Sequence, residues 1–194
     1  MREIEIKAKL KDKDKVMEKL KALGCSFESP ITQSDTVYAE DVDTLENFRS
    51  GTVFLRLRVK NNSKVLFTLK TRGVNDLDSP VEIELEVSSK EEMEKAIIIM
   101  GYKEAITVNK TRVITHYNNC EICIDDVENL GMFIEMEKLT EEGNSQEIQE
   151  EMFKFFESLG ITHDDRVMSG YDILMWQKKL GYDKSSIINI DNAL

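Results

Sequence analysis

Acidic and basic side chains alternate with apolar ones in the first stretch of the chain, MREIEIKAKL. Glu3, Glu5 and Lys7 occupy every second position, so a β-strand here would carry all three side chains on one face. Carboxylates grouped in this way can bind a hard divalent cation, and a lysine beside them can bind a phosphate oxygen. A solvated sheet face is the alternative explanation of this single stretch.

The same alternation recurs along the chain, and most runs carry charges of one sign. The acidic runs contain Glu82, Glu84, Glu135 and Glu137, and the basic runs contain Arg56, Arg58, Lys70, Lys110 and Arg112. Like charges at alternate positions of one strand repel each other, whereas a merely solvated face would mix the two signs. The sorting therefore favours strands that face one another across a cavity or that hold charged ligands.

Several arginines and lysines directed at one place are typical of a site for an oligophosphate, since arginine binds two oxygens in a forked geometry. Carboxylates in the same cavity suit Mg²⁺, which is usually held by one or two carboxylates together with phosphate oxygens and water. Cations and a metal ion together stabilise the charge that develops in phosphoryl transfer. The sequence thus predicts a metal-dependent site for a chain of phosphates.

Short alternating runs predict eight strands, and helical periodicity predicts four helices. The strands are expected in the opening run and at 33–40, 52–60, 64–72, 81–87, 109–117, 120–127 and 131–138, and the helices at 11–24, 88–101, 145–160 and 170–181. Helices are expected to cover the apolar outer faces, with Trp176 as a packing residue. This pattern predicts an α+β fold, an antiparallel eight-stranded β-barrel (a tunnel) with a polar interior and flanking helices.

A degenerate internal repeat accompanies this pattern. EIEIKA at Glu3 and EIELEV at Glu82 are each followed by a helix that ends in glycine. Gln33 and Asp35 then follow the first helix at the same offsets at which Lys110 and Arg112 follow the second. Duplicated halves of this kind commonly build one sheet, and we see no linker between them. We therefore predict a single domain at 1–180 and a C-terminal tail at 181–194.

Composition narrows the class of protein. The 194 residues carry a net charge of −11, which disfavours nucleic acid as a partner. No apolar run is long enough to cross a membrane and the first residues do not form a signal peptide, so we expect a cytoplasmic protein with no membrane partner. Cys120 and Cys123 match the C-x-x-C spacing of metal sites, but on a strand they would point to opposite faces. They are expected to be small buried residues.

The ordered series of charged motifs resembles the CYTH family, also called triphosphate tunnel metalloenzymes. The motifs are EIEIK (Glu3, Glu5, Lys7), QSDTVY (Gln33, Asp35, Tyr38), FLRLRV (Arg56, Arg58), FTLKTR (Lys70), VEIELEV (Glu82, Glu84), VNKTR (Lys110, Arg112) and IDDVENLGMFIEMEK (Asp125, Glu135, Glu137). They span about residues 1 to 175. The last motif is similar to the class IV adenylyl cyclase branch.

The resemblance implies an eight-stranded tunnel that binds a nucleoside or other triphosphate with Mg²⁺ or Mn²⁺, with a homodimer as the possible assembly. On this resemblance, the expected catalytic residues are Lys7, Lys70 and Asp125, the phosphate contacts are Lys7, Arg56, Arg58, Lys70, Lys110 and Arg112, the metal ligands are Glu3, Glu5, Glu135 and Glu137, and the supporting residues are Glu82 and Glu84. Three functions stay open. They are an adenylyl cyclase that forms cyclic AMP and pyrophosphate from ATP, a triphosphatase acting on inorganic, thiamine or nucleoside triphosphate, and a non-catalytic module that binds polyphosphate or nucleotide.

Overall fold

The computed structural model describes residues 2–40, 53–71, 81–141 and 143–181. Its residue contacts divide the chain into two compact units. Unit 1 consists of residues 1–31 and 110–168, and unit 2 of residues 32–109 and 169–194. Each unit is described by itself. The tail expected at 181–194 lies, beyond Gly181, outside the described residues, so the predicted division into one domain and a tail stays a prediction.

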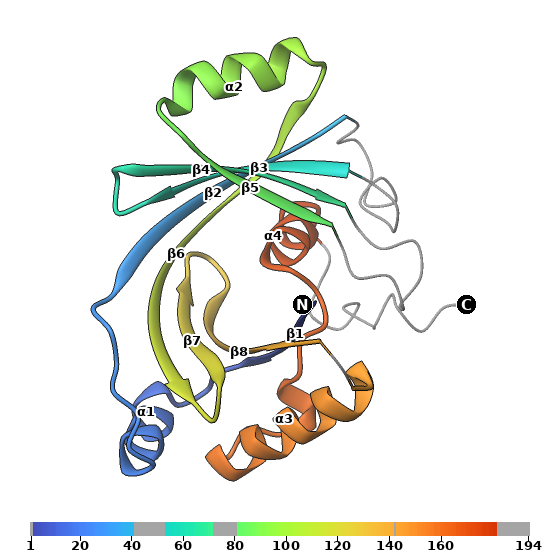
Figure 1. Ribbon diagram of the computed structural model, residues 1–194. Helices are drawn as coiled ribbons and strands as arrows, with labels where there is room; N and C mark the ends of the chain where they lie inside the picture. Colours follow the sequence, from blue (N-terminus) through green and yellow to red (C-terminus); the bar gives the residue numbers. More distant parts are fainter. Residues whose placement is uncertain (1, 41–52, 72–80, 142, 182–194) are drawn as a thin grey trace. The chain divides into compact units, whose positions relative to one another are not determined.

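The described residues form eight strands and four α-helices (Figure 1). The strands are β1 (Arg2–Lys9), β2 (Ile31–Ala39), β3 (Val53–Lys60), β4 (Lys64–Thr71), β5 (Glu82–Val87), β6 (Lys103–Tyr117), β7 (Cys120–Val127) and β8 (Gly131–Thr140), and the helices are α1 (Lys13–Ala22), α2 (Lys90–Ile99), α3 (Ser145–Leu159) and α4 (Tyr171–Lys179). The sheet order is β1-β8-β7-β6-β2-β3-β4-β5, with antiparallel pairing in each registered pair. The prediction of an α+β fold on eight antiparallel strands is confirmed. None of the helices in the described residues has both the length and the apolar character that a membrane span requires.

Unit 1 is built on β1, β8, β7 and the second part of β6. One face of these strands is apolar, and α1 and α3 lie against it (Figure 1). Ile6 of β1, Ile122 of β7 and Ile134 of β8 pack there with Leu20 of α1 and Phe156 of α3. Because side chains alternate along a strand, the opposite face of the same strands carries the charged residues.

Unit 2 is built on β2 to β5 and the first part of β6, and helices lie on both faces of it. On one face α2 contributes Ile97 to a cluster with Tyr38 and Leu57. On the other face Trp176 of α4 packs with Phe54 of β3, which lies on the same side of that strand as Arg56. Trp176 is therefore a packing residue, as predicted, but α4 covers an apolar part of the charged face rather than an outer face.

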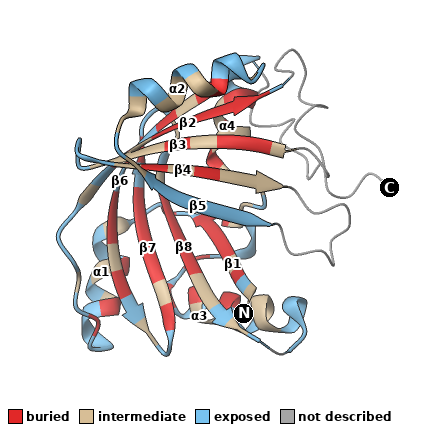
Figure 2. Ribbon diagram, turned by 45° about the horizontal axis from the view of Figure 1, so that its top comes forward, coloured by how far each residue is buried: buried red, intermediate tan, exposed pale blue. Residues whose placement is uncertain are grey.

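The β3–β4 turn follows from local chemistry, whereas β6 begins earlier than the sequence predicts. Asn61 and Asn62 both have positive φ angles, 49° and 56°, which gives a tight β3–β4 turn of the kind that asparagine favours between two antiparallel strands. Strand β6 begins at Lys103, six residues before the predicted start at Asn109. The strand β5 is exposed along most of its length (Figure 2).

Candidate functional site

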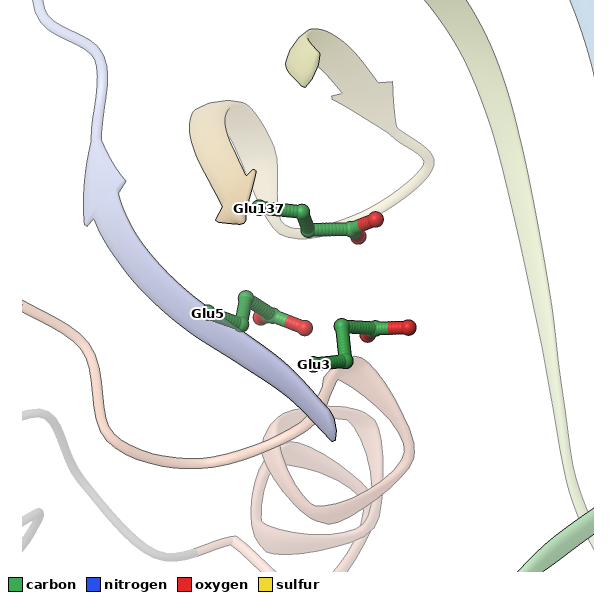
Figure 3. Close-up of side chains that lie close together, drawn as sticks. All are labelled: Glu3, Glu5 and Glu137. Atoms are coloured by element: carbon green, nitrogen blue, oxygen red, sulfur yellow. The ribbon is translucent and has the colours of Figure 1, made fainter. Parts of the chain in front are cut away.

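Three carboxylates converge on the charged face of unit 1. Glu3 and Glu5 project from β1 and Glu137 projects from β8, as Figure 3 shows. Glu5 and Glu137 are directly opposite each other in the β1–β8 register. Carboxylate oxygens of the three residues lie within 4.8 Å of one another. An all-oxygen set of this kind is what Mg²⁺ and Mn²⁺ prefer.

The electrostatics of this group favour a bound cation. Burial, together with the negative charges of Glu3 and Glu5, raises the pKa of Glu137 to about 7. Near neutral pH Glu137 therefore loses its proton in part, and its negative charge is then repelled by those of Glu3 and Glu5. A divalent cation would neutralise this repulsion, so the residues present fit the metal that the sequence suggests.

Lys7 lies next to the carboxylate triad. Its Nζ is 3.1 Å from Oε1 of Glu5 and 3.0 Å from Oε1 of Glu135. Burial alone would lower the pKa of Lys7, but the two carboxylates outweigh it and the pKa is raised. Burial alone would raise the pKa of Glu135, but the charges of Lys7 and Arg112 outweigh it and lower this pKa to about 2. Both groups are therefore charged at neutral pH.

A second buried ion-pair group adjoins Glu135 on this face. The guanidinium of Arg112 donates from Nε to Oδ1 of Asp125 at 2.7 Å and from Nη2 to Oδ2 at 2.6 Å. The same Nη2 also donates to Glu135, and Nζ of Lys110 lies 3.5 Å from Oδ2 of Asp125. Asp125 is fully buried. Lys7, Lys110 and Arg112 are thus each held by buried carboxylates on the face that carries the triad.

Unit 2 has a charged group of its own. Arg58 binds Asp35 in a forked geometry, with Nε to Oδ1 at 2.7 Å and Nη2 to Oδ2 at 2.6 Å. Arg56 contacts Glu82 and Glu84 at 3.1 and 3.4 Å. Further contacts complete the group, from Arg56 to Thr68 at 3.1 Å and from Lys70 to Glu82 at 2.9 Å. Burial would raise the pKa of Glu82, but the Lys70 charge and hydrogen bond lower it.

Sequence reasoning missed Lys60, the last residue of β3. It continues the alternation of Arg56 and Arg58 on the same strand. Its pKa is lowered by burial and by the charge of Arg58, and it makes no ion pair within the described part of the chain. The alternation of FLRLRVK, followed one step further, would have identified it.

The structure thus sorts the predicted site residues into two groups. Unit 1 brings together Glu3, Glu5, Lys7, Lys110, Arg112, Asp125, Glu135 and Glu137, and unit 2 brings together Arg56, Arg58, Lys70, Glu82 and Glu84. Glu135, expected as a metal ligand, is ion-paired with Lys7 and Arg112 and lies outside the triad. The catalytic, phosphate-binding and metal-binding roles of these residues stay predictions.

The two strand cysteines lie as the sequence predicts. Cys120 packs in the apolar core of unit 1. Cys123, three residues along β7, lies on the opposite face, directly across from Glu135 of β8. Both are buried and free, and burial raises the pKa of each thiol.

Comparison with known proteins supports the resemblance. The CYTH domain matches residues 1–171. The chain is 34% identical over 173 residues to the "Putative adenylate cyclase MJ0240" of Methanocaldococcus jannaschii, which covers 88% of this chain and 97% of that protein. Among solved structures, the PH1819 protein of Pyrococcus horikoshii is similar at 25% identity with a TM-score of 0.73, over 91% of this chain and 99% of that one.

A plant structure shares the fold at lower identity. It is HpAC1 of Hippeastrum, described as a putative adenylyl cyclase with a dominant triphosphatase activity. It is 17% identical, with a TM-score of 0.61 over 91% of this chain and 96% of that one. With the family match across most of its length, this chain belongs to the CYTH domain family. Members of this family are adenylyl cyclases or triphosphatases that bind nucleotide triphosphates.

Proposed function

We propose that this chain is a metal-dependent adenylyl cyclase of the class IV type, which converts ATP to cyclic AMP and pyrophosphate. The observation that carries the proposal is the charged face of unit 1, where three clustered carboxylates adjoin buried Lys7, itself 3.1 Å from Glu5. The relative from Methanocaldococcus jannaschii, matched over 97% of its length and named a putative adenylate cyclase, supports the choice of reaction.

In this reaction the ribose 3′-oxygen attacks the α-phosphorus. The bond from that phosphorus to the bridging oxygen of the β-phosphate breaks, pyrophosphate leaves, and the hydroxyl proton is released. Lys7, Lys110 and Arg112 would bind oxygens of the phosphate chain and offset the charge that builds on the leaving pyrophosphate. Mg²⁺ or Mn²⁺, held by Glu3, Glu5 and Glu137, would supply Lewis-acid polarisation of phosphate oxygens and of the attacking hydroxyl.

The buried carboxylates of the face fix these cations before substrate arrives. Asp125 holds two donors of Arg112 and lies 3.5 Å from Lys110. Glu135 holds Lys7 at 3.0 Å. Cations fixed in advance bind a phosphate chain without a further cost in side-chain entropy. Asp125, which the resemblance predicts as a catalytic residue, would thus act through the cations that it orients.

Hydrolysis of a triphosphate is the second candidate function. Lysine and arginine bind phosphate oxygens whatever group carries them, so the same face would accept inorganic or thiamine triphosphate. In that reaction a water oxygen attacks the terminal phosphorus, orthophosphate is released and the diphosphate remains. The triphosphatase activity described for the Hippeastrum protein, which shares this fold, is consistent with this alternative.

Product analysis separates the two reactions. The purified chain is incubated with ATP, and separately with inorganic triphosphate, in the presence of Mg²⁺ or Mn²⁺. Cyclic AMP and pyrophosphate from ATP, lost in Glu137→Gln, would support the cyclase, whereas orthophosphate without cyclic AMP would assign a triphosphatase. The matched control is Glu86→Gln, because Glu86 is a strand glutamate in an exposed pair with Lys64 at 3.0 Å. Bound triphosphate without any product would contradict both enzyme activities and leave a binding module.

A further inference from the structure

The strand β1, which carries Glu3 and Glu5, is the end strand of the sheet in the described part of the chain. In an antiparallel pair, alternate residues direct their backbone groups away from the neighbouring strand. The carbonyl of Glu5 accepts a hydrogen bond from Nε2 of Gln149 at 3.1 Å, and that of Lys7 accepts one from the backbone N–H of Val167 at 2.9 Å. A side chain of α3 and the segment that follows α3 therefore bind the free edge of β1.

The side-chain amide of Gln149 connects β1 to Arg166. Its Nε2 donates to the carbonyl of Glu5, and its Oε1 accepts from Nη2 of Arg166 at 3.4 Å. In an amide only the nitrogen donates and only the oxygen accepts. The contact with the guanidinium therefore turns the N–H groups of Gln149 toward the strand.

Arg166 is held by several contacts besides the one with Gln149. Its Nη1 donates to Oε1 of Glu150 at 3.0 Å, and its guanidinium carbon lies 5.2 Å from the centre of the Phe153 ring. The Phe153 side chain is fully buried. The backbone of Arg166 also forms an antiparallel bridge with Ala8 of β1. Gln149 thus connects Glu5 to a side chain that is already fixed in unit 1.

A pocket of about 180 Å³ lies at the same edge of β1. Glu5 and Lys7 contribute to its lining from the strand, and Gln149 and Arg166 contribute from the segment opposite. Close packing normally fixes neighbouring elements in a protein interior. Side chains do not fill the space here, so the hydrogen bonds hold this edge of the strand more than packing does.

The position of the β1 backbone matters for the carboxylate triad. Glu3 and Glu5 both project from β1 toward Glu137 (Figure 3). A turn of the strand about its own axis would move both carboxylates at once, whereas a binding site needs its ligands within about 0.5 Å and 10–20° of their working geometry. Groups that orient a metal ligand from behind typically change metal affinity by about 10- to 100-fold.

We propose that Gln149 is a positioning residue, which fixes the backbone of Glu5 so that the carboxylates of β1 meet Glu137 in the geometry that a divalent cation needs. This inference rests on the proposed metal-dependent function and extends it to a residue of α3. The competing explanation is that Gln149 only joins α3 to the sheet. In that case its loss would lower the melting temperature and leave the metal affinity of the folded chain unchanged.

The experiment measures metal affinity and stability separately in the full-length chain. Mn²⁺ alone is titrated and followed by electron paramagnetic resonance, at a temperature at which every variant is folded, and melting temperatures are measured with a chelator present. Gln149→Met keeps the length and the neutral charge of the side chain but removes its donor. We expect Mn²⁺ to bind about 3- to 10-fold more weakly, within the range of about 2- to 10-fold that one net hydrogen bond corresponds to.

Two further variants of α3 serve as controls. Gln146→Met makes the same change at an exposed position of the same helix, and we expect it to leave Mn²⁺ affinity and melting temperature unchanged. Phe155→Leu weakens the packing of the helix, because the Phe155 ring stacks on Tyr117 with ring centres 4.7 Å apart. It should lower the melting temperature and bind Mn²⁺ as the wild type does, since the contact of Gln149 with Glu5 is kept.

The other results each contradict the inference in a distinct way. If Gln149→Met binds Mn²⁺ as tightly as the wild type, Gln149 does not position Glu5, and the proposed function stands. If Phe155→Leu weakens Mn²⁺ binding as much as Gln149→Met does, metal affinity follows the general stability of α3 and the role of Gln149 is structural. If the wild-type chain does not bind Mn²⁺, the proposed metal-dependent function fails, and the inference fails with it.

Discussion

Glu5 in β1 lies directly opposite Glu137 in β8, and the carboxylates of both reach oxygens of Glu3 within 4.8 Å. Like charges facing each other across two strands destabilise a sheet. Lys7 is 3.1 Å from Glu5 but offsets only part of this charge, because it is also paired with Glu135. The arrangement is consistent with a site that gains stability when a divalent cation binds, and this can be tested by binding, by pH and by mutation.

The Glu137→Gln variant should bind Mn²⁺ at least about 10-fold more weakly than the wild type, since loss of even an indirect contact to a metal ligand has effects of that size. Titration of the metal alone, followed by electron paramagnetic resonance or calorimetry, measures this. The metal-free variant should melt at or above the wild-type temperature at pH 8, because one of three crowded charges has been removed. Equal Mn²⁺ affinity in the two proteins would show that Glu137 is not a ligand.

Stability of the metal-free protein should fall as the pH rises from about 4.5 to about 7 because of Glu137. Its pKa is raised from 4.5 to about 7 in the folded state, so in this window the folded chain holds a proton that the unfolded chain has lost. Glu135 is shifted the other way, to about 2. Its stabilising contribution is therefore complete above about pH 4.5 and is lost only in stronger acid.

Urea denaturation in the presence of a chelator, at several pH values between 5 and 8, checks this. The difference in unfolding free energy between wild type and Glu137→Gln isolates the contribution of this one group from those of other titrating residues. Saturating Mg²⁺ should reverse the trend, since the metal binds the deprotonated carboxylate. A wild-type protein that gains stability relative to the variant over this window would contradict the assignment.

Removal of the Asp125 carboxylate should be among the most destabilising single changes in the charged group of unit 1. The carboxylate is fully buried and accepts two hydrogen bonds from Arg112. Without it the buried guanidinium of Arg112 loses two hydrogen bonds and the buried Lys110 loses a nearby carboxylate, a change that typically costs about 3–5 kcal/mol. The unfolding free energy of Asp125→Ala measures this. Glu86→Gln, in an exposed pair, should stay within about 0.5 kcal/mol of the wild type.

Much of this fold could be predicted from the sequence, because alternation along a strand and helical periodicity are local patterns. Eight strands, four helices and the charged faces follow from them. Local patterns do not say which opposite charges meet. Arg112 pairs with Asp125 and Glu135 because β6, β7 and β8 are neighbours in the sheet, and Glu135 is thereby separated from the carboxylate triad.

Two departures have the same origin in tertiary structure. The helix α4 was expected to cover an outer face, but its amphipathic pattern could not show which face of the sheet would receive it. Trp176 packs beside Phe54, on the charged side of β3. The early start of β6 at Lys103 also depends on its partner, since Thr107 donates to Thr36 of β2 at 3.3 Å. Propensity and alternation alone specify neither contact.

The three thiols of the native protein should react slowly with a disulfide reagent such as dithionitrobenzoate at pH 8. Cys25, Cys120 and Cys123 are all buried, and burial raises the pKa of Cys120 and of Cys123. Because the thiolate is the reactive form, both access and ionisation oppose the reaction. In denaturant all three should react at once, which gives the reference for counting them.

Ligand dependence makes the thiol measurement specific for the charged face. Cys123 lies opposite Glu135 on that face, whereas Cys120 lies in the apolar core. If triphosphate and Mg²⁺ bind the folded chain, they lower the population of opened states and should slow the reaction of Cys123 further. The Cys123→Ala variant identifies which phase of the reaction belongs to this residue. Fast modification of Cys123 in the ligand-free native protein would show that the charged face opens to solvent, contrary to its burial in this structure.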